Sequence, residues 1–266
     1  MIEPFLKWPG GKRWLTTRHL DLFPKTYGSY IEPFLGGAAV FFALSPEKAY
    51  LSDANAELIN VYNRIKKDRI KVERGLARYQ KKHDSDFYYK VRATNPTDTI
   101  ARAVRFLYLN RTCFNGIYRV NKVGQFNVPI GTKDAVSFDE GYLEGVANSL
   151  RNVRIRTRDF ALAIRKAKKS DFVFIDPPYT VMHNNNGFVK YNAQLFSWED
   201  QARLATEIKA AGDRGVKVMM SNADHSSVRD LYKGFGTHHT LTRSSVLASD
   251  PERRRSSTEL LVTNYS

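Results

Sequence analysis

Short runs of strand-forming residues alternate along the chain with longer stretches of helical periodicity. The strand-like runs are bounded by turn residues and lie at 30–34, 49–53, 153–157, 171–176 and 216–221. Helix-type patterns follow them at 35–44, 54–67, 159–169, near 199–213 and after 225. Strands that alternate with helices pair in parallel, because each helix carries the chain back across the sheet. The pattern therefore predicts an α/β fold with a doubly wound, mostly parallel sheet.

This alternation lapses between residues 57 and 147. Helical patterns dominate there, for example at 97–110, and a polar stretch containing glycine and asparagine follows. Later, 235–243 and 257–265 have the pattern of a closing antiparallel pair. We therefore expect a discontinuous catalytic domain made of 1–56 and 148–266, interrupted by a mostly helical insert at 57–147.

The charge balance indicates the kind of partner that the protein binds. Forty-two lysine and arginine residues oppose 27 acidic residues, which gives a net charge of +15 at pH 7. The basic residues cluster at 64–82, 151–159 and 252–257. Part of each cluster is a solvated helix face, but the clustering favours a polyanionic partner, above all nucleic acid.

Cysteine usage and hydropathy bear on the compartment. Cys113 is the one cysteine, so no disulfide forms within the chain, and this fits a reducing cytosol. We find no signal peptide, no apolar run of membrane-spanning length and no metal-ligand spacing among the six histidines. We expect a cytoplasmic protein with no membrane association and no required metal.

The stretch DFVFIDPPY (171–179) carries the clearest chemistry. Its apolar run predicts a strand buried on both faces, and Pro177 and Pro178 end that strand because proline cannot donate to a sheet ladder. Ligands of doubly wound sheets bind at the carboxyl ends of the strands. There, the Asp176 carboxylate and the Pro177 carbonyl are two acceptors beside the stacking ring of Tyr179, which matches the amino group of a flat base. A tight strand end with a packing tyrosine is the alternative.

Accepting both N–H bonds of such an amino group would direct the lone pair of its nitrogen toward an electrophile. This is nucleophile activation by positioning and electrostatics, and it requires neither a metal nor a covalent intermediate.

A glycine-rich turn follows the first strand in EPFLGGAAVFF (32–42). Gly36 would let a ligand approach the backbone, and Asp53 ends the next strand 17 residues later, near the spacing of a carboxylate that binds ribose hydroxyls. The pattern is not GxGxxG, which disfavours a dinucleotide, and a plain turn is the alternative. In FLKWPGGK (5–12), Lys12 is either a partner for a small carboxylate or phosphate, or part of a segment anchored by Trp8.

FLKWPGGK, EPFLGGAAVFF and DPPY, in this order, resemble the Dam family of DNA adenine-N6 methyltransferases, the α group or D12 class of amino-methyltransferases. The resemblance covers most of the chain, including 109–131, where the family carries a DNA-reading β-hairpin within the insert. It departs at Ala38, where the F-x-G-x-G motif of the family has its second glycine. The resemblance implies a Rossmann-like methyltransferase fold and methyl transfer from S-adenosylmethionine to N6 of a flipped-out adenine in double-stranded DNA, at GATC.

The resemblance also implies roles for individual residues. Lys12 is expected near the methionine carboxylate of the cofactor, Asp53 at its ribose, and Asp159 and Phe160 at its adenine. The full expected cofactor set is Trp8, Lys12, Phe34, Gly36, Asp53, Asp159, Phe160 and Asp176. The catalytic set, which holds the target adenine, is Asp176, Pro177 and Tyr179.

DNA contacts are expected from Lys7, Phe114, Asn115, Arg119 and Pro129. Arg119 suits the O6/N7 edge of guanine, Phe114 would wedge into the base stack, and Pro129 would contact a thymine methyl. The basic residues of the insert would contact phosphates, which give affinity without sequence information. A structural loop with Phe114 in the core is the alternative.

Other functions stay open. One alternative is an RNA or N4-cytosine amino-methyltransferase, and the N4-cytosine enzymes usually resemble SPPY rather than DPPY. Another is a sequence-specific DNA-binding protein with a non-catalytic cofactor pocket. A restriction nuclease would need a metal-binding carboxylate pair that we do not find. The methyltransferase interpretation also includes a bacterial or phage origin and functional pairing with a restriction endonuclease. Loops at 183–188 and 244–257 have the composition of a substrate lid and a phosphate-binding loop, or of plain surface loops.

Overall fold

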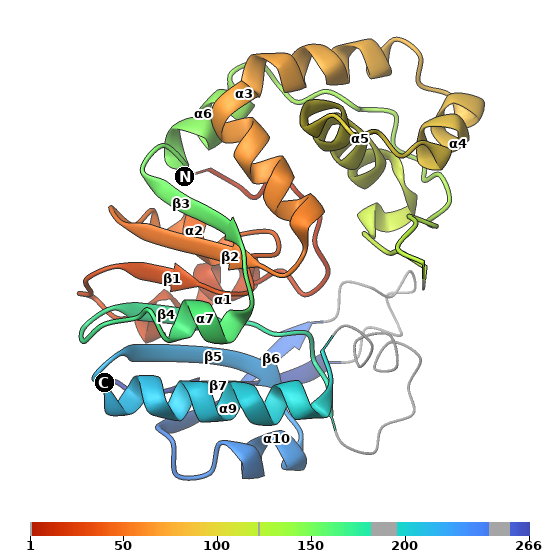
Figure 1. The fold of residues 1–266 in the computed structure, drawn as a ribbon. Helices are drawn as coiled ribbons and strands as arrows, with labels where there is room; N and C mark the ends of the chain where they lie inside the picture. Colours follow the sequence, from red (N-terminus) through yellow and green to blue (C-terminus); the bar gives the residue numbers. More distant parts are fainter. Residues whose placement is uncertain (1, 122, 182–195, 245–255) are drawn as a thin grey trace. The chain divides into compact units, whose positions relative to one another are not determined.

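The computed structural model describes residues 2–121, 123–181, 196–244 and 256–266 (Figure 1). Two compact units share the chain. Unit 1 consists of Met1–Thr16, Leu35–Glu47 and Asp53–Thr157, and unit 2 of Thr17–Phe34, Lys48–Ser52 and Arg158–Ser266. Each unit is thus built from three separate segments. The predicted domain limits at residues 57 and 147 stay a prediction, and the predicted loops at 183–188 and most of 244–257 lie outside the described residues.

The strands form a seven-stranded sheet in the order β3-β2-β1-β4-β5-β7-β6. β1 pairs in parallel with β2 and β4, and β4 pairs in parallel with β5. β7 is antiparallel to both β5 and β6. Their bounds are β1 (Tyr30–Glu32), β2 (Ala49–Asp53), β3 (Val153–Thr157), β4 (Phe172–Ile175), β5 (Lys217–Ala223), β6 (Thr237–Ser244) and β7 (Ser256–Thr263). The mostly parallel α/β sheet and the closing antiparallel pair are confirmed.

The middle of the sheet in unit 2 is buried on both faces. All four residues of β4 are buried, and their register runs from Phe172 opposite Lys217 to Ile175 opposite Met220. A strand covered on both faces needs apolar side chains in both directions, which explains its unbroken hydrophobic run. β4 ends at Ile175, and the half-buried Asp176 follows it directly.

Helices of unit 2 supply the apolar layer against these strands. They are α7 (Phe160–Ile164), α9 (Trp198–Asp213) and α10 (Ser226–Leu231), whereas the short 3-10 helix η1 (Leu20–Leu22) of the same unit has no buried residue. α9 starts with a reciprocal capping box between Ser197 and Asp200, and runs along β5 (Figure 1). Its residues Leu204 and Ile208 are fully buried in one cluster with Met220, as the helical spacing of the apolar positions requires.

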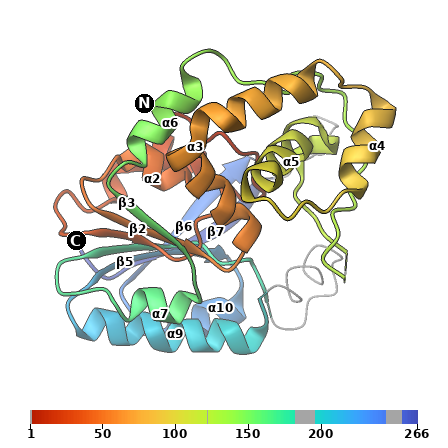
Figure 2. The same cartoon turned by 45° about the horizontal axis from the view of Figure 1, so that its top comes forward.

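Unit 1 is mostly helical. It holds α2 (Ala39–Leu44), α3 (Ala56–Gln80), α4 (Ser85–Ala93), α5 (Thr99–Thr112) and α6 (Tyr142–Ser149), while α1 (Arg13–Arg18) begins in it. α3 and α5 pack along each other, with α4 beside α5 (Figure 2). A Cβ on Gly75 of α3 would lie 2.5 Å from Cγ2 of Val104 on α5, so glycine permits this close crossing. α3 extends through the basic stretch 64–80 and is kinked at Asp68, which has non-helical backbone angles.

The predicted β-hairpin of the insert is present as isolated antiparallel bridges. They join Cys113 to Ile130 and Val120 to Phe126. The backbone of Asn121 also donates to the carbonyl of Gln125 at 2.8 Å, which closes the turn between them. Cys113 follows α5 directly, and a 3-10 turn, η2 (Phe114–Gly116), comes after this first bridge. Further backbone bonds join the two sides, from the Phe114 N–H to the Pro129 carbonyl and from the Asn127 N–H to the Arg119 carbonyl, so backbone pairs order the loop although no regular strands form in it.

Candidate active site

The turn Asp176–Tyr179 in unit 2 begins directly after β4, as the sequence predicts. The hydroxyl of Tyr179 donates to Oε2 of Glu259 at 2.8 Å and lies 2.9 Å from Oγ of Ser221. Ser221 is on β5 and Glu259 on the neighbouring β7, and both are buried. The phenol end of Tyr179 is thus fixed by two strands, which sets the orientation of its ring.

The environment keeps the Tyr179 phenol neutral. Burial raises its pKa well above the usual value, and the negative charges of Asp176 and Glu259 raise it further. A neutral phenol keeps its proton and can donate it in the hydrogen bond to Glu259. Without this donor, the buried Glu259 carboxylate would lose a hydrogen-bond partner. The Asp176 charge acts on Tyr179 in this way because the two residues share one short turn.

An aromatic cluster in unit 2 brings together two of the predicted cofactor residues. The rings of Phe34 and Phe160 are stacked, with centroids 5.4 Å apart, and Phe196 contacts both. The guanidinium of Arg203 lies over the Phe160 ring at 4.1 Å. The cluster joins the segment after β1 to the start of α7 and forms an apolar wall of the kind that holds a flat ring system.

Asp159 has structural partners of its own. It caps α7 by accepting from the backbone N–H of Ala161, and its two oxygens accept from Arg203 at 2.9 Å each. The bond to Arg203 is the main reason that the pKa of Asp159 lies below its usual value. Any contact to a ligand would use the carboxylate lone pairs that remain after these bonds.

In unit 1, Asp53 is tied to the glycine-rich turn. Its Oδ2 accepts from the Gly36 N–H at 3.1 Å and its Oδ1 from the Asn55 N–H at 2.9 Å. Burial raises the pKa of Asp53, and these backbone bonds act in the opposite direction. A carboxylate accepts about four hydrogen bonds, so acceptor capacity remains beside these backbone bonds for a ribose hydroxyl. The Asp53 carboxylate, as an acceptor, therefore fits the predicted cofactor group.

The turn itself requires special backbone conformations. Gly36 has φ +45°, and a Cβ there would lie 2.8 Å from Cδ1 of the Trp8 ring. Ala38, where the family motif has glycine, also adopts the left-handed conformation, with φ 56° and ψ 33°. This conformation costs a non-glycine residue about 1–2 kcal/mol. The turn thus keeps its glycine-like shape at Ala38 despite the substitution.

Trp8 and Lys12 are both held within unit 1. The Trp8 ring stacks on Tyr118, with centroids 5.6 Å apart, and so links the N-terminal segment to the hairpin. Lys12 is only 3% exposed, and its ammonium donates to the Gly10 carbonyl at 2.7 Å. A buried ammonium is retained where it has hydrogen-bond acceptors or an anionic ligand.

The predicted DNA-contacting residues of the insert lie on the surface. Phe114 is 52% exposed, which contradicts the alternative that places it in the core, and it begins the turn that contains Asn115 at φ 55°. The Phe114 N–H donates to the carbonyl of exposed Pro129 at 2.9 Å, so the two sides of the loop are joined here. An exposed aromatic ring on a fixed turn has the form of a wedge.

Arg119 and Lys7 are each positioned by an asparagine. Nε of Arg119 donates to Oδ1 of Asn127 at 2.9 Å, and within the described chain its two terminal nitrogens make no hydrogen bond. The buried Asn110 amide holds the Lys7 backbone through bonds of 3.0 and 2.8 Å. The Lys7 stem packs on Gly116, where a Cβ would lie 2.1 Å from Lys7 Cδ. Burial, with Lys133 nearby, lowers the pKa of Lys7.

Several of these partners were not predicted from the sequence. They are Ser221, Glu259, Asn110, Asn127 and Arg203. Asn110 gave a usable signal, since it is a lone amide within the apolar run of α5. Asn127 lies eight residues from Arg119 in the same loop, and Ser221, Glu259 and Arg203 lie on elements distant in sequence from the residues that they hold, so no local pattern marks these three.

Across the described ranges, no group of three or more His, Cys, Asp or Glu side chains is arranged to hold a metal ion. Cys113 is buried, and burial raises its pKa to about 11, so its thiol stays protonated at neutral pH. No helix within the described residues is long and apolar enough to cross a membrane.

A family model and several individual proteins are similar to this chain. Residues 8–246 match the model of the D12 class N6 adenine-specific DNA methyltransferases. The chain is 37% identical to the type II methyltransferase M1.LlaDCHI of Lactococcus lactis, over 99% of this chain and 96% of that protein. It is 35% identical to the type II methyltransferase M.MjaIII of Methanocaldococcus jannaschii, over 99% of both, and 32% identical to the DNA adenine methylase of Haemophilus influenzae, over 97% and 92%.

Proposed function

The chain belongs to the D12 class of N6 adenine-specific DNA methyltransferases, and we propose that it methylates the adenine of GATC in double-stranded DNA after that base has flipped out of the helix. As a DNA adenine methyltransferase it uses S-adenosylmethionine as the methyl donor. The observation that carries the proposal is the turn after β4, where Asp176, Pro177 and a phenol-anchored Tyr179 follow one another.

In the proposed reaction, Tyr179 stacks on the flipped adenine while its hydroxyl stays bound to Glu259. The Asp176 carboxylate and the Pro177 carbonyl each accept a hydrogen bond from one N–H of the adenine amino group. These two bonds orient the nitrogen lone pair for in-line attack on the methyl group. When bound, S-adenosylmethionine supplies the electrophilic methyl group. The nitrogen loses one proton after the transfer, and Asp176 or water accepts it.

For the cofactor, we propose two groups of contacts. Asp53, aligned by Gly36, accepts from the ribose hydroxyls, and Lys12 binds the methionine carboxylate beside Trp8. Phe34 and Phe160 supply the apolar wall for the adenine ring, with Asp159 at its edge. Phosphate contacts by the basic surface hold the DNA, and the exposed Phe114 fills the space left by the flipped base.

The proposal that GATC is the target site rests on the insert loop, which runs from Cys113 to Ile130. Arg119 presents its terminal nitrogens for the O6/N7 edge of guanine, and exposed Pro129 faces a thymine methyl. Asn115 lies on the same loop, and Lys7 of the N-terminal segment packs on that loop at Gly116. We further propose that the enzyme works in the cytoplasm of a bacterium or in phage infection, and that it pairs with a restriction endonuclease, as the name type II methyltransferase suggests for its relatives.

Transfer of labelled methyl from S-adenosylmethionine to three duplexes tests the proposal. One duplex contains GATC, one contains GATC with both adenines already N6-methylated, and one has a scrambled site. Label on the first duplex alone supports adenine methylation at GATC. Label on the first two contradicts this site or base, and label on none favours a DNA-binding protein without activity or an RNA substrate. Asp176→Asn should abolish the transfer while DNA binding survives.

A further inference from the structure

The basic residues of α3 differ in whether they have partners. Arg64 is paired with Asp68 at 2.7 Å, Arg69 with Glu73 at 2.9 Å, and Lys66 donates to the Val153 carbonyl. In contrast, neither Arg74 nor Arg78 forms an ion pair within the residues that the structure describes, and both are exposed. Three of the seven basic side chains of α3 are therefore engaged within the fold, while Arg74 and Arg78 face solvent.

The exposed cations share one face of the helix. Lys71, Arg74 and Arg78 follow at spacings of three and four residues, which places them in a row on the arm of α3 beyond the kink at Asp68. Lys71 is 66% exposed and keeps only a 3.5 Å contact to Asp68. From Lys71 to Arg78 the row rises about 10 Å along the helix axis. This is close to three phosphate-to-phosphate steps of about 3.4 Å along one DNA strand.

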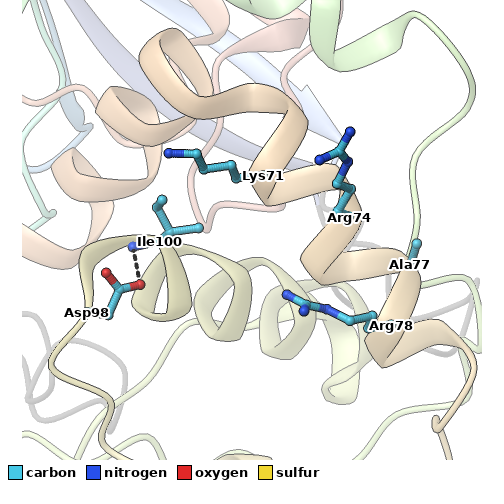
Figure 3. A pocket seen from close by; sticks show the side chains of 6 residues that line it. All are labelled: Lys71, Arg74, Ala77, Arg78, Asp98 and Ile100. Carbon is cyan, nitrogen blue, oxygen red and sulfur yellow. Dashed lines mark hydrogen bonds between the residues drawn. The ribbon is translucent and has the colours of Figure 1, made fainter.

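This row lines one side of a hollow of about 570 Å³ between α3 and the start of α5. Figure 3 shows Lys71 and Arg78 reaching from α3 toward α5, with Asp98 and Ile100 on the opposite side. Asp98 is the one carboxylate of the lining, and it caps α5 by accepting from the N–H groups of Ile100 and Ala101. The hollow therefore keeps a positive excess.

Two features of the lining point to a polyanion rather than to a small phosphate ligand. The backbone N–H groups at the start of α5, which would cradle a small anion, are already bonded to Asp98. The lining also contains no aromatic ring on which a nucleotide base would stack. Long, flexible cations in a row over an open hollow instead suit a backbone of regularly spaced charges.

We propose that Lys71, Arg74 and Arg78 bind the sugar-phosphate backbone of DNA outside the methylation site, an inference that rests on the proposed function. The hollow lies at the start of α5 and the insert loop at its end, and 14 residues of helix span about 20 Å. At 3.4 Å per base pair, this separation corresponds to about six base pairs. The row thus extends the DNA footprint beyond the four recognised bases.

The test compares Lys71→Gln/Arg74→Gln/Arg78→Gln with a control that removes the same charge elsewhere, Lys166→Gln/Lys168→Gln/Lys169→Gln, three exposed residues of unit 2. Affinity is measured against salt for a duplex of about 10 base pairs, which ends before the hollow, and one of about 30 base pairs. Thermal unfolding verifies that both variants fold.

On the long duplex, the slope of log affinity against log salt should fall by about 2 to 3 in the α3 variant, because each phosphate contact contributes about 0.9. The short duplex should be bound almost as by the wild type, and methyl transfer at saturating DNA should be unchanged. A retained slope, or an equal loss in the control, would overturn the inference while methyl transfer by the wild type still supports the proposed function. Absence of methyl transfer from the wild type itself would defeat the proposed function and this inference with it.

Discussion

The hydroxyl of Tyr179 donates a hydrogen bond to the carboxylate of Glu259 at 2.8 Å, across 80 residues of sequence. The bond ties the turn after β4 to β7, and Ser221 of β5 completes it. The position of the Tyr179 ring therefore depends on the correct pairing of β5 with β7.

Tyr179→Phe keeps the stacking ring but removes the donor to Glu259. We expect a loss of about 1–3 kcal/mol in the free energy of unfolding, because a buried acceptor loses its partner. The turnover number should fall more than the DNA affinity, since the ring is no longer fixed. Urea unfolding and steady-state kinetics measure both. The proposed anchoring is wrong if Tyr179→Phe unfolds and turns over like the wild type, and Glu259→Gln, which keeps an acceptor, should be the milder change.

Arg119→Ala should reduce discrimination at one base of the target site by about 1–3 kcal/mol, since its guanidinium is expected on a guanine edge. Methyl transfer to a set of duplexes with single substitutions in GATC measures this. Arg74→Ala is the matched control, because a phosphate contact should weaken binding to all sequences alike. Uniform weakening by Arg119→Ala as well would place Arg119 on a phosphate.

Asp159→Asn keeps the cap of α7 but removes the ion pair with Arg203. The folded-state pKa of Asp159 is depressed, so its contribution is present above the usual aspartate pKa and is lost as pH falls through the lower folded value. Because both partners are about 40% exposed, we expect at most about 1 kcal/mol at neutral pH. Thermal unfolding of both proteins without cofactor, from neutral pH down to about 2.5, should show the difference vanish at the acid end. A difference that persists there would point to a role other than charge.

Cys113 should resist alkylation in the folded protein. Burial raises its pKa to about 11, so at pH 8 only about one thiol in a thousand is ionised. The rate of iodoacetamide modification should rise about tenfold per pH unit from pH 7 to 9, and urea should abolish the protection. A rate that levels off near pH 8.5 in the native protein would show an ordinary thiol.

Much of the fold followed from periodicity, because each predicted strand had to be buried where its pattern was apolar. The strand 153–157 has the predicted bounds, and Asp176 begins the predicted turn. The packing of the insert loop, in contrast, did not follow from periodicity: Tyr118 stacks on Trp8 and Phe106, so rings from two other segments hold the loop in addition to its backbone bonds. Local patterns do not specify such packing.

The candidate site, too, was only partly predictable from the sequence. Residues proposed to act at strand ends, such as Asp53 and Tyr179, were visible because turn chemistry marks those positions. Their supporting partners were not, because Glu259 reads as an ordinary polar position of a strand until β7 is known to lie beside β5. Asp159 was expected at the cofactor, and its bond to Arg203 could only be seen in three dimensions.

The place of β7 between β5 and β6 has a consequence for biosynthesis. A ribosome delivers β7 after every other strand of the sheet, yet β7 supplies the hydrogen-bonding partner of both neighbours and the acceptor for Tyr179. During translation, β6 has no strand to pair with until β7 emerges, and Tyr179 has no Glu259 to bind. In a nascent chain that stalls before β7, we therefore expect the turn proposed for catalysis to lack its anchor until the sheet is complete.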